Sequence, residues 1–232
     1  MAYGVLIAGR SGSGKSSSIR NLPPAETCII NIDMKPLPFK GASKMYIQKK
    51  EEDCSIEEKK LGKIGNTKDY TAIINAMVGA NGLPRIKYIV LDTLSHMITG
   101  KFMGDIKTKG YDKYVNLATD AYNVLQLIPQ LREDIIVFVL IHTEYYTDDK
   151  GQIVWKAKTF GKLLEEKITI ESYFSVVLEA IARENKDQQE EYLFNTNDVS
   201  NPTKSPMGMF EDKFIDNDLL YVAQKIKEYE QI

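Results

Sequence analysis

The sequence has few cysteines, little net charge and no long hydrophobic run. Cys28 and Cys54 are the only cysteines in 232 residues, which excludes a disulfide framework or a cysteine-rich metal site and suits a reducing cytosol. The 30 basic and 32 acidic residues give a net charge of −2, so the chain as a whole is not attracted to nucleic acid or to an anionic membrane. The apolar runs are far shorter than a membrane span, and the first of them is not a signal peptide. We therefore expect a cytoplasmic protein without a membrane partner.

Hydrophobic residues make up 43% of the chain, enough for the core of a single α/β domain over residues 1–232. Strand and helix patterns alternate, which predicts a mainly parallel central sheet flanked by helices, with an antiparallel extension at the C-terminal end. Residues 35–66 are irregular and rich in charge, and residues 143–158 are predicted to form a hairpin. The predicted strands are residues 3–8, 27–33, 87–92, 134–142, 173–182 and 191–195, and the predicted helices are residues 16–22, 69–80, 113–132, 161–167 and 216–229.

The stretch GRSGSGKS, residues 9–16, joins the first predicted strand to the first predicted helix. Its spacing fits the phosphate-binding loop G-x-x-x-x-G-K-[ST] (the P-loop), which is informative in this strand, loop and helix setting. Glycines let backbone N–H groups close around an anion, and the positive end of the helix dipole supports them. Lys15 supplies a cation for the β- and γ-phosphates, and the Ser16 hydroxyl suits Mg²⁺, which prefers oxygen ligands. We predict that ATP is bound by Gly9, Arg10, Ser11, Gly12, Ser13, Gly14, Lys15, Ser16 and Ser17.

Two later strands end in side chains that suit the same site. Asp92 closes the run YIVLD, the usual position of a carboxylate that holds Mg²⁺ together with a residue such as Ser16. His142 closes the next strand, and we expect it to face the terminal phosphate, because the carboxyl ends of parallel strands form the ligand crevice. An aspartate that caps a helix and a histidine that packs at the rim are the structural alternatives. His96, four residues after Asp92, is interpreted as structural.

In this order, the segments GRSGSGKS, IINID, YIVLDTLSHM and FVLIHTEYY resemble the RecA-type branch of the P-loop ATPases. They are most similar to small phage-type ATP-binding proteins of the RecA-like, single-strand-annealing kind, also grouped as an AAA-24 family. The resemblance spans about residues 1–210 and implies a RecA-like ATPase core that assembles as a homo-oligomeric ring or filament. It also implies a role beside other phage proteins in DNA recombination or replication, in the host cytoplasm. Lys204 resembles a late lysine of these proteins, and the resemblance implies that it reaches a phosphate on its own or a neighbouring subunit; the alternative is a solvated loop lysine.

The chain departs from the RecA pattern at the catalytic glutamate. RecA carries this residue after its second strand, whereas this chain reads NIDMKPLPF there. Asp33 and Glu144, both at strand ends near the crevice, are the candidates for ordering the attacking water, because positioning and electrostatics matter more than basicity in phosphoryl transfer. Asp33 is preferred by a small margin. The predicted catalytic set is Lys15, Asp33, Asp92, His142 and Glu144.

Two segments combine lysines with aromatic rings, a chemistry that suits single-stranded DNA. Lysines neutralise phosphates, and aromatic faces stack on unpaired bases without regard to sequence. Both segments lie where the resemblance places the DNA loops of RecA-like folds. A half-buried hairpin with solubilising lysines is the alternative for the second. The residues are Lys101, Phe102, Lys107, Lys109, Tyr111, Lys113 and Tyr114 in the first segment and Tyr145, Tyr146, Trp155, Lys156, Lys158 and Phe160 in the second.

Two other functions stay open. An assembly protein that uses ATP to switch a protein partner would suit the acidic balance and the irregular residues 35–66. A small-molecule kinase would share the P-loop but usually needs a lid rich in arginine. The arginines of this chain are scattered singly, at positions 10, 20, 85, 132 and 183.

Overall fold

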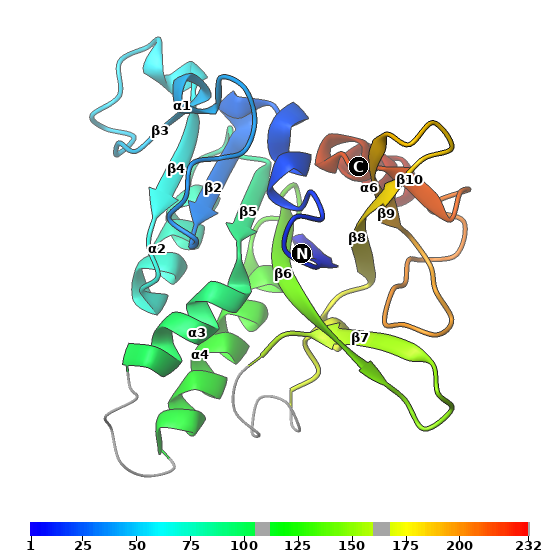
Figure 1. Cartoon of the computed structure of the whole chain (residues 1–232). Coiled ribbons are helices and arrows are strands. Elements are labelled where there is room, and N and C mark those ends of the chain that lie inside the picture. The colour runs from blue at the N-terminus through cyan, green and yellow to red at the C-terminus, as the bar shows by residue number, and fades with distance from the viewer. Residues whose placement is uncertain (105–111, 160–167, 232) are drawn as a thin grey trace.

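The computed structural model describes residues 1–104, 112–159 and 168–231. Its centre is a ten-stranded sheet in which nine strands follow the order β10-β9-β8-β1-β6-β5-β2-β4-β3, while β7 pairs with β6 (Figure 1). All pairs from β8 to β3 are parallel, and β9, β10 and β7 are antiparallel to their neighbours. The strands are β1 (Tyr3–Gly9), β2 (Thr27–Asn31), β3 (Tyr46–Ile47), β4 (Gly62–Asn66), β5 (Tyr88–Asp92), β6 (Ile136–Thr147), β7 (Ile153–Ala157), β8 (Val176–Glu184), β9 (Glu190–Asn195) and β10 (Phe214–Asp216).

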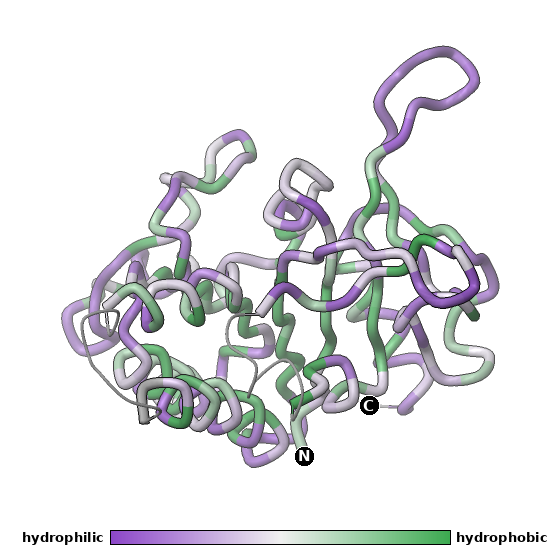
Figure 2. The backbone as a smooth tube through the Cα atoms, turned by 60° about the horizontal axis from the view of Figure 1, so that its bottom comes forward, coloured by the Kyte–Doolittle hydropathy of each residue, from purple (hydrophilic) through white to green (hydrophobic). Residues whose placement is uncertain are grey.

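Helices cover both faces of the sheet, because the buried strands send alternate side chains to opposite sides. Leu6 and Ala8 of β1 pack in one core cluster with α2, α3 and α4, whereas Val5 and Ile7 pack in a second with α6 and the short helix η1. Figure 2 shows hydrophobic segments in the interior and hydrophilic segments in the outer loops. In the part of the chain described, no helix has the length and hydrophobicity to cross a bilayer. The helices are α1 (Ala42–Met45), α2 (Tyr70–Asn81), α3 (Leu94–Gly104), α4 (Asp112–Leu127) and α6 (Leu219–Glu230), with 3-10 helices η1 (Ser16–Asn21), η2 (Pro24–Glu26), η3 (Glu58–Lys60), η4 (Ile128–Gln130) and η5 (Ile170–Tyr173).

The predicted fold class is confirmed: a mainly parallel sheet lies between helices, and β8, β9 and β10 form the antiparallel extension. Residues 35–66 differ from the prediction of an irregular excursion, because β3 and β4 extend the sheet beyond β2. The predicted strand 134–142 continues as β6 to Thr147 and forms the hairpin with β7.

The two segments predicted to contact DNA take different forms. Lys101 and Phe102 belong to α3, so the first segment begins as a helix rather than a loop. Trp155 of the second is only 1% exposed and packs in the core. Three residues of the first segment, Lys107, Lys109 and Tyr111, together with Phe160 of the second and the predicted helix 161–167, lie outside the described residues.

Candidate nucleotide-binding site

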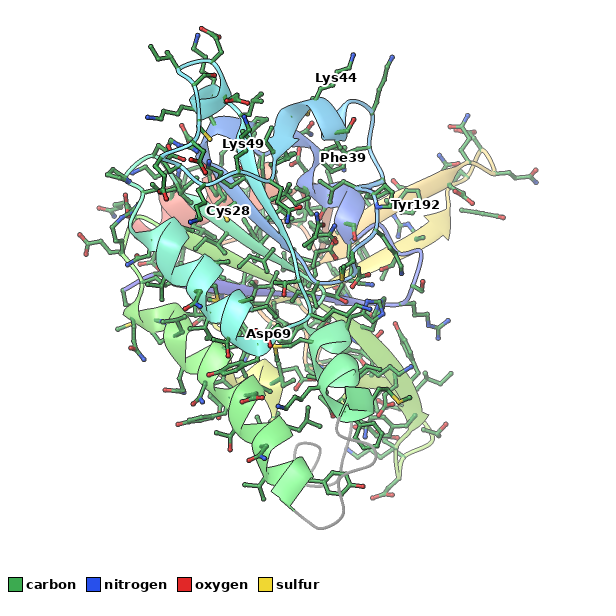
Figure 3. The ribbon with its side chains drawn as sticks, turned by 90° about the vertical axis from the view of Figure 1, so that its left-hand side faces the viewer. Cys28, Phe39, Lys44, Lys49, Asp69 and Tyr192 are labelled. Carbon is green, nitrogen blue, oxygen red and sulfur yellow. The ribbon has the colours of Figure 1, made fainter. Side chains whose placement is uncertain are left out.

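The P-loop follows β1 at the carboxyl edge of the sheet. Gly9 is in register with His142 of β6 on one side and Ala180 of β8 on the other. Beyond it the chain turns through Gly12 and Gly14, whose φ angles of 82° and 87° favour glycine. Tyr192 lies against this turn, with its Cδ1 atom 2.9 Å from where a Cβ on Gly14 would stand. The sequence therefore folds the P-loop between β6 and β8, with the β8–β9 hairpin that carries Tyr192 alongside (Figure 3).

The close approach of β8 makes Gly9 a sensitive position. A Cβ there would stand 2.6 Å from the carbonyl oxygen of Ala180 and 2.5 Å from Ser13 Oγ. We expect Gly9→Ala to lower the free energy of unfolding by about 1–3 kcal/mol, because strand backbone cannot easily move away. The matched control is Gly79→Ala in α2, where nothing lies within 4 Å, and it should stabilise by about 0.5–1 kcal/mol. Urea unfolding measures both, and equal effects of the two substitutions would contradict the prediction.

Lys15 is held beneath the P-loop. Its side chain is buried, and Nζ donates hydrogen bonds to the carbonyl oxygens of Gly9 at 2.8 Å and Arg10 at 2.7 Å. Burial lowers the pKa of Lys15 to about 8, although the nearby charges of Asp92 and Asp33 oppose that shift. The two carbonyl oxygens carry only partial negative charge, so a phosphate group would be a stronger partner for the ammonium group.

Asp92 ends β5 on the opposite side of β6 from the P-loop. Its carboxylate is 3% exposed, and Oδ1 accepts a hydrogen bond of 3.0 Å from Ser16 Oγ. Burial raises the pKa of Asp92 to about 6, with the negative charge of Asp33 adding to the shift and the Ser16 hydrogen bond opposing it. A buried carboxylate beside a serine hydroxyl fits Mg²⁺, which prefers hard oxygen ligands.

His142 lies between these two groups, because β6 separates β1 from β5. Its ring Nδ1 is 3.3 Å from Lys15 Nζ, and its backbone N–H donates to Ser95 Oγ at 3.0 Å. Burial lowers the pKa of His142 to about 4, and the charges of Lys15 and His96 lower it further. The imidazole is therefore neutral at pH 7 and accepts a hydrogen bond from Lys15.

This lowered pKa predicts a loss of stability in acid. The unfolded chain binds a proton at His142 near pH 6.5 and the folded chain only near pH 4, so the stabilising contribution is present above pH 6.5 and is lost as the pH falls towards 4. The full shift corresponds to about 3 kcal/mol, and partial solvent screening reduces it to about 1–2 kcal/mol. His142→Gln cannot titrate, so the stability of the wild type relative to this variant should be lower at pH 5 than at pH 7.5 in urea unfolding. A difference that is the same at both pH values would contradict the prediction.

Asp33 and His96 lie beside His142 in the lining of the same cavity. Asp33 Oδ1 accepts hydrogen bonds from the Thr93 backbone N–H at 3.0 Å and from Thr93 Oγ1 at 2.8 Å, and it also contacts His96 Nδ1. Burial alone would raise the pKa of Asp33, but the hydrogen bonds from Thr93 and the charge of His96 outweigh it and lower the pKa. The rings of His96 and His142 are 5.6 Å apart between centroids. Ligand atoms of Asp33, His96 and His142 lie within 4.8 Å of one another, but the adjacent Lys15 cation disfavours a metal ion there.

These groups line one cavity of about 640 Å³, a size that suits a nucleotide. It gathers most of the predicted ATP-binding residues with Asp33, Asp92 and His142, whereas Gly9 and Ser13 lie outside its lining. His96, interpreted from the sequence as structural, also lines it, as does Tyr192, which no sequence pattern indicated. The position of His96 four residues after Asp92 was the available signal. The lining comprises Arg10, Ser11, Gly12, Gly14, Lys15, Ser16, Ser17, Asn31, Asp33, Lys35, Pro36, Leu37, Pro38, Asp92, Thr93, His96, His142, Thr143, Lys158 and Tyr192.

Two predicted site residues lie elsewhere. Glu144 is on the part of β6 that pairs with β7, and its carboxylate forms an ion pair of 2.9 Å with Lys156. This position argues against Glu144 as the residue that orders water. Lys204 is exposed and exchanges backbone hydrogen bonds with Val177 of β8, so it does not line the cavity of its own chain.

The parallel sheet, the P-loop and the Ser16–Asp92 pair define a P-loop nucleotide-binding protein. The family model AAA_24, described as an AAA domain, matches residues 1–207. The chain therefore belongs to this family of AAA-type P-loop NTPases. No curated protein matches the sequence.

Proposed function

We propose that the protein is a RecA-like, Mg²⁺-dependent ATPase that couples the state of its nucleotide to a partner. The observation that carries the proposal is the convergence of Lys15, Ser16 and Asp92, with Ser16 Oγ 3.0 Å from the Asp92 carboxylate and Lys15 beneath the P-loop. A triphosphate with Mg²⁺ needs these groups: a cation for the β- and γ-phosphates and hard oxygen ligands for the metal.

Binding of ATP would change the partners of four side chains: Lys15, Ser16, Asp92 and His142. Lys15 would exchange the carbonyl oxygens of Gly9 and Arg10 for phosphate oxygens, a stronger charge-assisted contact. Ser16 and Asp92 would hold Mg²⁺, which supplies neutralisation of the charge that develops on the phosphates. His142 would lose its contact with Lys15, so the strand that carries it senses whether the nucleotide is present.

The hairpin of β6 and β7 is the element that would transmit this signal. β6 runs without interruption from the sheet through His142 to Thr147, where the hairpin turns. A second link comes from the P-loop itself, since the Arg10 guanidinium stacks 3.9 Å over the Tyr145 ring, and the Tyr145 hydroxyl donates to Glu179. Movement of Arg10 or His142 on nucleotide binding would therefore shift the hairpin.

We propose single-stranded DNA as the partner, in phage recombination or replication by a ring or filament of this chain. Support comes from the resemblance to RecA-like proteins and from Tyr146, whose ring is 49% exposed on the hairpin and available for base stacking. Lys204, which is exposed and outside its own cavity, would then reach the nucleotide of a neighbouring subunit.

A protein partner is the second candidate, favoured by the character of the same hairpin. Ile153, which pairs with Thr147 at the end of the hairpin, is 70% exposed, which suits an apolar contact. Residues 143–158 carry equal charge of each sign, with Glu144, Asp148 and Asp149 against Lys150, Lys156 and Lys158, so the hairpin has little attraction for phosphates.

The test is ATP hydrolysis with and without single-stranded DNA, at low and moderate salt, with Lys15→Ala as the blank. DNA binding predicts stimulation that weakens with salt and that Tyr146→Ala removes. Tyr229→Ala is the matched control, because this tyrosine is similarly exposed, at 43%, on α6. Hydrolysis that DNA does not change, without salt-sensitive DNA binding in ATP, contradicts the DNA proposal and favours the protein partner.

A further inference from the structure

The contacts of Asp33 show why this carboxylate is a poor base. Oδ1 already accepts two hydrogen bonds from Thr93 and contacts His96, and Oδ2 lies 3.6 Å from the ammonium group of Lys35. These donors stabilise the ionised form, and a well-stabilised carboxylate has little tendency to take a proton. The side chain is also only 12% exposed, so a water molecule has limited access to it.

The same contacts orient His96. An ionised carboxylate can only accept a hydrogen bond, so the His96 Nδ1–H group is the donor to Asp33, and the lone pair of the ring is on Nε2 whenever His96 is neutral. The His96 side chain is 32% exposed and lines the nucleotide cavity. This arrangement of a buried carboxylate behind an imidazole prepares the free nitrogen to accept a proton.

His96 also lies at the end of the cavity where the γ-phosphate is expected. Lys15, the ligand of the β- and γ-phosphates, is 3.3 Å from His142, and the His142 ring is 5.6 Å from the His96 ring. His96 is therefore one ring beyond Lys15 in this row of side chains. In-line attack requires a water on the side of the γ-phosphate opposite its bond to the β-phosphate, and the inference places that water beside His96.

We infer that His96 is the catalytic base of ATP hydrolysis and that Asp33 is its positioning residue. The inference rests on the proposed ATPase function. The water oxygen forms a bond to the γ-phosphorus as its proton passes to His96 Nε2, and the bond from phosphorus to the bridging oxygen breaks with its electron pair left on ADP. The imidazolium then releases the proton to solvent, so ATP and water yield ADP, inorganic phosphate and a proton. The Asp33–His96 pair takes the place of the glutamate that the RecA pattern would supply.

The test compares His96→Ala and Asp33→Asn with Thr99→Ala, the control on the same helix outside the cavity lining. Steady-state hydrolysis gives kcat and KM, and a fluorescent ATP analogue gives nucleotide affinity. We expect His96→Ala to lower kcat by about 100-fold while the affinity stays within about threefold. Added imidazole should restore part of kcat in this variant. The double variant should be no slower than His96→Ala alone, because Asp33 acts through His96.

His96→Gln keeps a donor for Asp33 but has no basic nitrogen, so it carries the test if the alanine variant does not fold. It should lose kcat to a similar extent, and imidazole should not restore it. An unchanged kcat in either His96 variant overturns the inference. The inference is also overturned if imidazole does not restore kcat in His96→Ala and the double variant shows the summed losses of His96→Ala and Asp33→Asn. If the wild type binds ATP but does not hydrolyse it, the proposed ATPase function and this inference both fail, whereas unchanged kcat in an active enzyme refutes only the inference.

Discussion

Lys15→Ala should abolish ATP hydrolysis and weaken ATP binding by about 100-fold or more, since two charge-assisted hydrogen bonds are worth about 3 kcal/mol together. The buried position of Lys15 makes this effect specific. Its ammonium group is already held at the P-loop by the carbonyl oxygens of Gly9 and Arg10, so phosphate binding exchanges these partners without bringing the cation in from solvent. Equilibrium binding of a fluorescent ATP analogue and a phosphate-release assay measure the two effects.

The matched control for this substitution is Lys59→Ala, an exposed lysine outside the cavity. It should leave both binding and hydrolysis unchanged. The melting temperature of Lys15→Ala should stay close to that of the wild type, because two effects oppose each other. Removal of a desolvated cation stabilises the fold, whereas the loss of a donor for two carbonyl oxygens destabilises it. A folded Lys15→Ala protein that binds ATP as the wild type does would contradict the assignment of the P-loop as the nucleotide site.

The P-loop and Asp92 were predictable because their chemistry is local in sequence. Gly9, Gly14, Lys15 and Ser16 have a spacing that is meaningful only after a strand, and the run Tyr3–Gly9 forms that strand. Asp92 follows an apolar run long enough for a buried strand, and its carboxylate meets Ser16 at the sheet edge. In both cases a short segment contained the pattern and its structural context.

The Asp33–His96 pair and the outer strands were less predictable because they depend on tertiary contacts. His96 is in the first turn of α3, and nothing in the sequence fixes that its ring meets Asp33, which is 63 residues earlier. β4 contains Gly62, Lys63 and Gly65, which are weak strand residues, and it forms a strand because β2 and β3 pair with it on both sides. Glu144 was predicted at a strand end near the cavity, but β6 continues past it into the hairpin, which places this carboxylate outside the cavity lining.

Asp92→Asn should lower Mg²⁺-dependent hydrolysis by about 100-fold, because the amide keeps the shape but loses the charge that holds the metal.

The same substitution should raise the stability of the metal-free protein. Burial raises the pKa of Asp92 from 3.8 to about 6, so the folded chain binds a proton more tightly than the unfolded chain between these values. The stabilising contribution of the protonated form is therefore lost as the pH rises through about 6. At pH 7.5 without metal, the ionised carboxylate costs up to about 3 kcal/mol, and asparagine removes that cost.

Urea unfolding in EDTA tests this trade-off. Asp92→Asn should be more stable than the wild type at pH 7.5, and the difference should shrink at pH 4.5, where the folded wild type is protonated at Asp92. Asp134→Asn is the control, with an expected effect of opposite sign. Burial alone would raise the pKa of Asp134, but Lys87 and Arg132 outweigh burial and lower the pKa. Loss of this ionised carboxylate should therefore destabilise the protein at pH 7.5. Mg²⁺ with ATP should then stabilise the wild type more than Asp92→Asn, because the metal compensates the buried charge that the variant lacks. A variant that is less stable in EDTA yet hydrolyses ATP normally would show that Asp92 is a structural residue and that the metal is held elsewhere.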